Sequence, residues 1–264
     1  MRSTRVVHLT DAGQRLVPHA RTALRGLEQL DAALAVQHRV LRLGVLDVPI
    51  VELEGVLARL NGVVLDTTNH AAPALLDALV GGDVDVVLTR LDGPRPAGTE
   101  ATLLRLDPVL ALVRTNYPSA TVAPGNIRTW TFDVSAFWPE FERFQSSFEG
   151  AVGAALHRLP LASDDFDRAL DINDHLARHP QDAMLTISGN RVLPAGYRTV
   201  GLTPLQPYLA WSLLWRSDDR SAAVARFLDA ARRASTQERW LRHDHLVGRP
   251  WLPPGDPWSH IFAA

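Results

Sequence analysis

Short apolar runs alternate with helical patterns in the first third of the chain. The apolar runs are rich in Val and Leu and comprise residues 40–46, 63–66 and 84–88. Between them, apolar side chains recur at three- and four-residue steps in residues 53–60 and 74–80, and Gly81-Gly82 ends the second of these predicted helices. Strands that alternate with helices at this spacing form a parallel sheet with right-handed crossovers. The sequence therefore predicts an α/β fold.

A second α/β unit is predicted after residue 116, where proline and glycine interrupt the pattern. Further strands are predicted at residues 103–106, 109–113, 183–187 and 209–215. Further helices are predicted at residues 151–158, 164–179 and 221–233, and the aromatic-rich residues 137–148 are predicted to be partly helical. The tail at residues 249–258 is rich in Pro and Trp, so we expect no regular structure there. It is either disordered or a strap over an apolar groove.

One long amphipathic helix is predicted ahead of the sheet, from Thr10 to about Gln37. Thr10 can cap its first turn, and Leu and Ala recur along one face at helical spacing. A solitary helix with such a stripe needs a partner. It packs either on its own domain or on the same helix of a second chain.

The composition excludes several classes of protein. Hydrophobic residues make up 46% of the chain and charged residues 21%, and no apolar run approaches the roughly 20 residues of a membrane helix. The chain has no cysteine, which excludes disulfides and thiolate chemistry. Its net charge of −2 argues against a dedicated nucleic-acid binder. With no apolar signal core at the N-terminus, we expect a cytoplasmic protein.

The N-terminal stretch Arg2-Ser3-Thr4-Arg5-Val6-Val7-His8-Leu9-Thr10-Asp11-Ala12-Gly13 resembles the end of the DNA-binding domain of LysR-type transcriptional regulators. In that family R-x-x-R-x-V-x-L-T-x-A-G forms the wing and opens the linker helix. Three later stretches resemble the family's effector domain: Leu41-Arg42-Leu43-Gly44, residues 76–88 with the pattern L-x-x-L-x-x-G-x-V-D-V-V-L, and residues 213–218 with 227–228. The resemblance covers nearly the whole chain and is weakest at 125–158 and beyond 233.

The resemblance implies two Rossmann-like subdomains, as in type 2 periplasmic binding proteins, preceded by a long N-terminal linker helix. The expected division is a wing remnant at 1–9, a linker and dimerisation helix at 10–38, an effector-binding domain at 40–240 and a Pro/Trp-rich tail at 241–264. Within the effector-binding domain, residues 40–115 and 201–240 would form subdomain I, and residues 116–200 would form subdomain II.

The family's DNA-reading helix-turn-helix precedes the wing, so we expect it to be missing from this chain. The wing remnant would then offer only Arg2, Thr4 and Arg5 to DNA phosphates. A second departure is the polar run at residues 177–182, which stands where the family has a G-x-G turn. The implied partners are a small-molecule effector, promoter DNA in the intact protein, and further copies of the chain in a homodimer or tetramer.

Effector contacts are expected where loops at the carboxyl ends of parallel strands meet helix N-termini. The residues expected there are Asp47, Val48, Thr67, Thr68, Asn69, Thr89, Arg90, Ser163, Asp164, Ile187 and Ser188. Several have a plainer interpretation, since Thr67, Thr68, Asn69 and Ser163 are also typical turn and cap residues. Arg90 is either solvated or a ligand contact, and Asp47 would repel an acidic effector unless it pairs with Arg90.

Other chemistry is weakly indicated. His175 and His179 have the four-residue spacing of shared metal ligands, but no H-E-x-x-H motif is formed. The aromatic residues between Trp130 and Phe148 form either core or a wall for a flat apolar effector. The chain has no P-loop, no G-x-G-x-x-G and no nucleophile elbow, so we expect neither an enzyme nor a cofactor or metal.

The sequence therefore predicts the effector-sensing and dimerising portion of a LysR-type regulator, which binds a small molecule between two subdomains to control transcription. The alternative is a small-molecule-binding protein without its own DNA contacts, which acts through mixed dimers or as a buffer.

Overall fold

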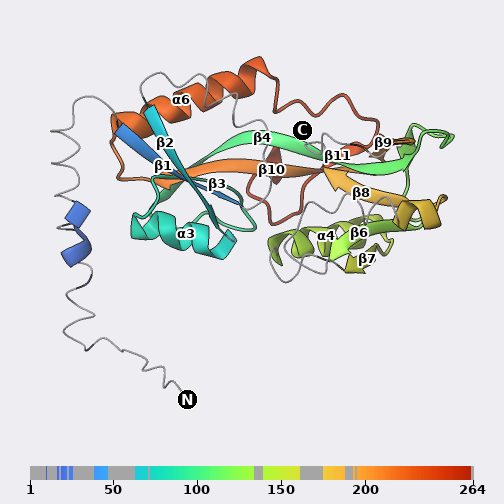
Figure 1. Cartoon of the computed structure of the whole chain (residues 1–264), viewed down its shortest axis with the longest axis horizontal. Coiled ribbons are helices and arrows are strands. Elements are labelled where there is room, and N and C mark those ends of the chain that lie inside the picture. Colours follow the sequence, from blue (N-terminus) through green and yellow to red (C-terminus); the bar gives the residue numbers. More distant parts are fainter. Residues whose placement is uncertain are drawn as a thin grey trace.

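The computed structural model describes residues 10, 17, 19–22, 24–25, 39–46, 63–70, 72–133, 139–160, 175–187, 193 and 195–262. Its strands form one continuous path in the order β2-β1-β3-β10-β4-β8-β6-β7, with β5, β9 and β11 joined to it at the sides. Figure 1 shows two lobes connected by the long strands β4 (Thr99–Arg114) and β10 (Leu205–Arg216). These two strands pair antiparallel over most of their length.

The first lobe contains the parallel strands that the sequence predicts. They are β1 (Arg39–Leu46), β2 (Val63–His70) and β3 (Val86–Arg90), with β1 in the middle. Helices α3 (Ala72–Gly81) and α6 (Ala222–Gln237) lie on opposite sides of this sheet (Figure 1). Gly44 is required between sheet and helix, because a Cβ there would lie 2.8 Å from the Leu75 side chain.

The second lobe is built on the far half of β4. There β4 pairs with β8 (Ala183–Ile187) and β9 (Tyr197–Leu202), and β8 continues to β6 (Thr129–Asp133) and β7 (His157–Pro160). The short strand β5 (Thr121–Val122) pairs with β9. Helix α4 (Pro139–Val152) packs here through Phe144 and Phe148, which are both buried. The predicted second α/β unit is thus present.

Three predicted elements were wrong in detail. Residues 103–106 and 109–113 belong to one strand, because β4 exchanges β10 for β8 just after Pro108, where a missing N–H is tolerated. Residues 151–158 are not a helix: α4 ends at Val152, Gly153 has a φ of 66°, and β7 begins at His157. Strand β2 extends beyond residue 66 to His70, since its threonines favour extended backbone. The predicted helix at 53–60 and most of that at 164–179 lie outside the described residues.

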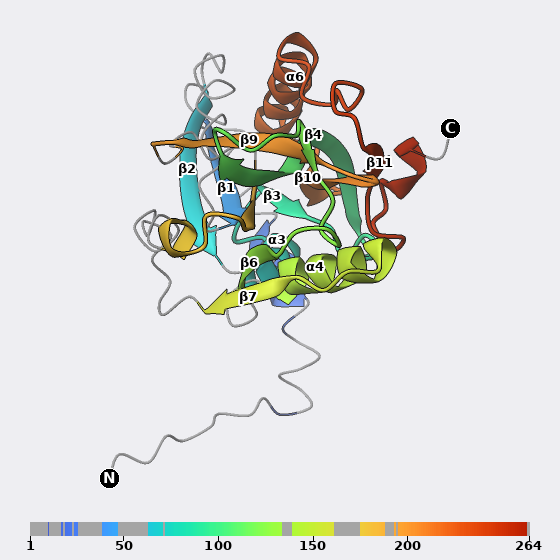
Figure 2. The ribbon, with the colours of Figure 1, turned by 90° about the vertical axis from the view of Figure 1, so that its right-hand side faces the viewer.

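The C-terminal tail is an ordered strap. Residues 249–251, expected to be irregular, form β11 (Arg249–Trp251), which pairs parallel with Leu205–Pro207 of β10. Leu252 is buried, and the chain ends in the short 3-10 helix η1 (Ser259–Phe262). Figure 2 shows that this strap and α4 lie next to each other on the same side of the molecule. The disordered alternative is therefore wrong, and the strap alternative is confirmed.

The predicted N-terminal helix is described only in part, at residues 17, 19–22 and 24–25, all of which are helical. Arg25 contacts the first lobe through Asp218, at 3.9 Å between Nη1 and Oδ2. No helix in the described part of the chain is long and apolar enough to cross a membrane.

Candidate functional site

The candidate site is built around Arg90, the last residue of β3, which is paired in register with Trp211 of β10. Only 4% of Arg90 is exposed, and its Nε and Nη1 atoms have no hydrogen-bond partner among the described residues. A buried donor without a partner costs about 1–3 kcal/mol, and a guanidinium cannot lose its charge. Arg90 therefore holds a positive charge and unused donors at the junction of the two lobes.

The second lobe supports Arg90 with an aromatic ring. The guanidinium carbon lies 4.9 Å from the centre of the Phe144 ring of α4, a cation–π geometry. Phe141, one turn earlier, stacks on Phe144 with the ring centres 5.6 Å apart. Since Arg90 comes from β3 and both rings come from α4, a change in the spacing of the lobes would act directly on this contact.

Three acidic side chains act electrostatically on Arg90 but form no ion pair with it. Burial lowers the pKa of Arg90, and the negative charges of Asp256, Asp92 and Glu140 oppose that shift, Asp256 most strongly. No carboxylate in the described ranges lies within 4.0 Å of its nitrogens. Arg143 of α4 instead takes Asp92 as its ion-pair partner across the two lobes. The donors of Arg90 thus remain free for a ligand.

Asp256 matches Arg90 in being buried and incompletely bonded. It is 3% exposed, its Oδ1 accepts a hydrogen bond from the Trp258 backbone N–H at 2.9 Å, and its Oδ2 has no partner in the described structure. Burial raises the pKa of Asp256 above its ordinary value. Glu140 at the start of α4 also has a buried oxygen, Oε2, without a partner. The site thus contains one unused cationic group and two unused acceptors.

Some of the predicted effector residues lie where the sequence placed them, and others lie inside a strand instead of a loop. Thr89 and Arg90, expected after β3, are its last two residues, and the Thr89 hydroxyl donates to the Arg90 carbonyl at 3.3 Å. Thr67, Thr68 and Asn69, expected in a loop, lie within β2 instead. Gly44 of β1 pairs with both Thr68 and Val87, so β2 and β3 end at the same edge of the sheet. The Thr68 hydroxyl is buried there and has no partner in the described part of the chain.

Ile187 ends β8 in the second lobe and is half-buried. The remaining predicted site residues lie outside the described residues, as does the expected pairing of Asp47 with Arg90. They are Asp47, Val48, Ser163, Asp164, Ser188, Arg2, Thr4 and Arg5.

Sequence reasoning missed four charged residues of the site: Asp92, Glu140, Arg143 and Asp256. None belongs to a motif, and their positions span 165 residues of sequence, from 92 to 256. The aromatic concentration before residue 148 was a usable signal, because it contains Phe144. Phe144 and Phe148 belong to the buried core, whereas Trp130 packs in a separate cluster with Leu112 and Met184, and the aromatic wall for an effector stays a prediction.

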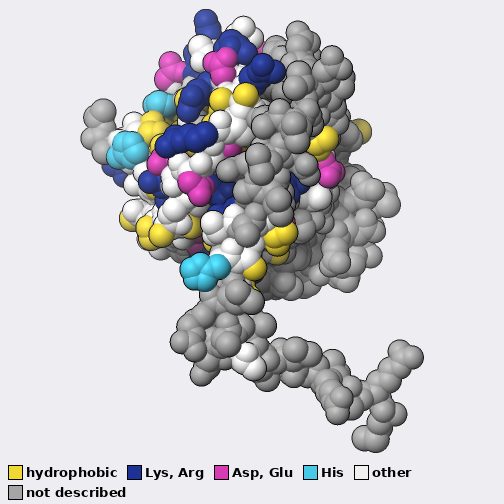
Figure 3. Space-filling model, turned by 90° about the vertical axis from the view of Figure 1, so that its left-hand side faces the viewer, with side chains coloured by type: hydrophobic (Ala, Val, Ile, Leu, Met, Phe, Trp, Pro, Cys, Tyr) yellow, Lys and Arg dark blue, Asp and Glu magenta, His cyan; other side chains and the backbone are white. Residues whose placement is uncertain are grey.

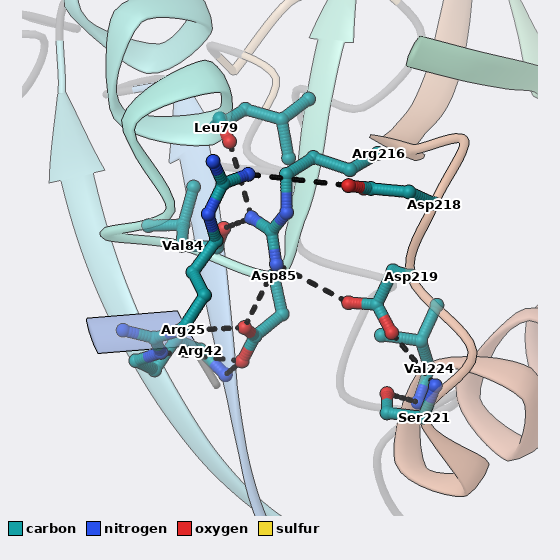
Figure 4. A network of polar contacts seen from close by, with 10 residues as sticks. All are labelled: Arg25, Arg42, Leu79, Val84, Asp85, Arg216, Asp218, Asp219, Ser221 and Val224. Atoms are coloured by element: carbon teal, nitrogen blue, oxygen red, sulfur yellow. Dashed lines mark hydrogen bonds and ion pairs between the residues drawn. The ribbon is translucent and has the colours of Figure 1, made fainter. Parts of the chain in front are cut away.

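A second polar network lies in the first lobe, where its hydrogen bonds join separate elements of the fold (Figure 4). Asp85 of the V-D-V-V-L stretch accepts hydrogen bonds from the backbone and guanidinium of Arg42. Arg216, at the end of β10, donates to the carbonyls of Leu79 and Val84 and to Asp219, and lies 3.7 Å from Asp85. These bonds tie β1, α3 and β10 together near the start of α6.

A histidine cluster surrounds Trp130 in the second lobe. The rings of His175 and His179 are 4.7 Å apart, and that of His175 is 4.3 Å from Trp130. His175 is buried, which lowers its pKa, and its Nε2 has no partner in the ranges that the structure describes. The described residues include no group of three potential ligands placed to hold a metal. His175 and His179 thus pack against each other and against Trp130.

Charges of both signs are interspersed on the described part of the face shown in Figure 3. This face therefore does not offer an extended surface of one sign.

No protein-family model and no curated protein matches the sequence. Solved structures do match it. Full-length BenM is 14% identical, with 89% of this chain and 81% of that chain covered and a TM-score of 0.63. CbnR in complex with its target DNA is 16% identical, with 87% and 83% covered and a TM-score of 0.62, and CbnR is described as a LysR family transcriptional regulator.

The effector binding domain of a BenM variant is 14% identical, with 77% of this chain and 97% of that chain covered and a TM-score of 0.60. At this level of identity the likeness concerns the fold. The predicted fold is thereby confirmed: the chain is a mixed α/β protein that shares the type 2 periplasmic-binding-protein fold of the effector-binding domains of LysR-type regulators.

Proposed function

We propose that this chain is the effector-sensing and dimerising portion of a LysR-type transcriptional regulator. The shared fold and the wing-like stretch at residues 2–13 support this assignment together. The N-terminal stretch is specific in order and spacing, and the fold follows it at the expected distance. Promoter DNA would be a further partner, and effector binding would control transcription.

The observation that carries the sensing role is Arg90. A buried guanidinium with two nitrogen atoms that lack hydrogen-bond partners, at the junction of two lobes, is suited to an anionic ligand. Phe144 beneath it and Phe141 beside it favour a ligand with an apolar or aromatic body. Thr68 and Thr89, at the same edge of the sheet, would add hydroxyl contacts. The proposed effector is therefore a small carboxylate.

The proposed mechanism is a change in the spacing of two subdomains. Subdomain I would comprise residues 40–115 and 201–240, and subdomain II residues 116–200, joined by β4 and β10. A ligand on Arg90 would also contact α4 and so favour one arrangement of the lobes. The contact of Arg25 with Asp218 would give that change a route to the N-terminal helix, because Asp218 lies two residues after the end of β10.

Calorimetry with acetate, succinate and phenylacetate tests the sensing role. We expect phenylacetate to bind best, and Arg90→Met to weaken it at least about 30-fold, since two charge-assisted hydrogen bonds are lost. Arg226→Met, which removes an exposed arginine of α6, is the matched control and should leave binding unchanged. Equal binding to Arg90→Met and the unaltered chain would exclude Arg90 as the anchor.

Light scattering tests the dimerising role. The chain of 29.0 kDa should behave as a dimer or tetramer if the N-terminal helix pairs with that of a second copy. A strictly monomeric chain at micromolar concentration would contradict the proposed role of that helix.

A further inference from the structure

We propose that the C-terminal strap, residues 249–262, is a lid over the Arg90 site, and that Asp256 occupies the electrostatic place of an effector carboxylate until a ligand displaces it. This inference rests on the proposed function of Arg90 as an anion anchor. It gives a role to the C-terminal tail, for which the sequence predicted either disorder or a strap.

One end of the strap is fixed to the second lobe. Strand β11 pairs with the start of β10, and Trp251 packs its ring on Phe144 and Phe148 at 5.7 and 5.4 Å between centres. Gly248 allows the approach, because a Cβ there would lie 2.0 Å from the Leu202 carbonyl oxygen. The strap thus shares Phe144 with Arg90, so the two contacts lie on one helix.

The other end of the strap is fixed to the crossing strand. The Trp258 indole donates a hydrogen bond to the Ser212 hydroxyl of β10 at 2.8 Å. Phe262 in η1 packs near Tyr208 and His243, with ring centres 5.6 and 4.9 Å away. Ser212 is paired with Thr89 in the sheet register, one residue from Arg90. The strap therefore spans both lobes and passes the site.

The loop between these two anchors, residues 253–257, contains three prolines, Gly255 and Asp256. Asp256 is the acidic group whose charge acts most strongly on Arg90, where it opposes the lowering of the Arg90 pKa by burial. The two do not form an ion pair, and each keeps a buried polar atom without a partner. The loop thus brings a carboxylate near enough to act on the charge of Arg90 without giving the guanidinium a hydrogen-bond partner.

This geometry favours a lid over a permanent plug. With the loop in place, Nε and Nη1 of Arg90 have almost no accessible surface, so a carboxylate reaches them only if the loop or α4 moves. When the loop opens, water would hydrogen-bond to Asp256 and the ligand carboxylate would accept hydrogen bonds from Arg90. The buried polar atoms of both residues would then have partners. The three prolines limit the internal freedom of the loop, so it would move as one unit between Trp251 and Trp258.

Fluorescence resonance energy transfer can test the lid directly, because the chain contains no cysteine to compete for labels. Gly150 on α4 and Gly255 in the loop are both exposed, and a Cβ at either would meet nothing within 4 Å. The pair Gly150→Cys and Gly255→Cys therefore reports the distance between α4 and the loop. The pair Gly150→Cys and Asp77→Cys, with Asp77 exposed on α3, reports the spacing of the lobes as a control.

We expect phenylacetate to lower transfer in the α4–loop pair, beyond any change in the control pair, and Arg90→Met to abolish that response. We also expect Asp256→Asn to bind phenylacetate about 3- to 10-fold more tightly, because the competing carboxylate is gone. Asp244→Asn removes an exposed acid of the same C-terminal region and should leave affinity unchanged.

Two results would overturn the lid in distinguishable ways. If phenylacetate binds in an Arg90-dependent manner but the α4–loop distance stays fixed, or if Asp256→Asn weakens binding, the lid is wrong while the anion site stands. If neither the unaltered chain nor Asp256→Asn binds acetate, succinate or phenylacetate, the anion site fails and the lid fails with it.

Discussion

Replacing Arg90 by methionine should make the ligand-free protein more stable, which is unusual for a buried residue. The two nitrogen atoms without hydrogen-bond partners, Nε and Nη1, cost about 2–6 kcal/mol together in the native state. Methionine has a similar length, fills the same space against Phe144 and brings no polar group. The lost cation–π contact and the lost attraction to Asp256 oppose the gain by about 1–3 kcal/mol.

The net expectation is a stabilisation of about 2 kcal/mol, because Arg90 forms no ion pair that the substitution would break. For a chain of this size, that corresponds to a rise in unfolding midpoint of roughly 4–8 °C. Differential scanning calorimetry without ligand measures it. The matched control is Arg216→Met, the same substitution at an arginine whose donors are used by two carbonyls and by Asp219. It should lower the midpoint, and a fall in both variants would refute the interpretation of Arg90 as unsatisfied.

Three further predictions concern the framework. Asp85→Asn should lower the free energy of unfolding in urea by about 2 kcal/mol, because the charge-assisted bonds to β1 are lost; an unchanged midpoint would contradict that role. Gly248→Ala should cost at least about 2 kcal/mol and make the C-terminal strap sensitive to protease, since the new Cβ overlaps the Leu202 carbonyl. Burial lowers the pKa of His175 in the folded protein, so the unfolded chain binds a proton at this residue more readily as the pH falls toward 5.5. The thermal unfolding midpoint should therefore fall from pH 7.5 to pH 5.5, and it should fall by less in His175→Gln.

The fold could be predicted because periodicity and turn signals are local. The strands at 40–46 and 84–88 and the helix at 74–80 each carry their pattern within a few residues, and the structure confirms them with shifted ends. The errors arose where pairing with a distant part of the chain determines where a strand ends. No local feature of Pro108 indicates that β4 changes neighbours there rather than ending, because that depends on β8, which lies more than 70 residues later.

The site was predicted in part for the same reason. Thr89 and Arg90 follow from the rule that parallel strands present their carboxyl ends at one edge. Asp256 could not be found that way, because it reaches Arg90 only after β11 has paired with β10 and turned the tail back across the lobes. Its signal was the Pro and Trp content of the tail, which indicates a packed strap but not the position of a charge.

The contrast between two arginines is the reason why Arg90, and not Arg216, is proposed as the ligand-binding arginine. Arg216 and Arg90 both lie at ends of adjacent strands and both are largely buried. Arg216 has a carbonyl or carboxylate partner on each terminal nitrogen, so removing its charge can only cost stability. Arg90 instead packs on an aromatic ring, has no acidic side chain in ion-pair contact and has donors without partners. If stability were the only requirement, an apolar side chain would be the better choice at this position. A residue that weakens the free protein is explained if its hydrogen-bonding groups are satisfied in another state, and the proposed carboxylate-bound state would supply the partners that Arg90 lacks.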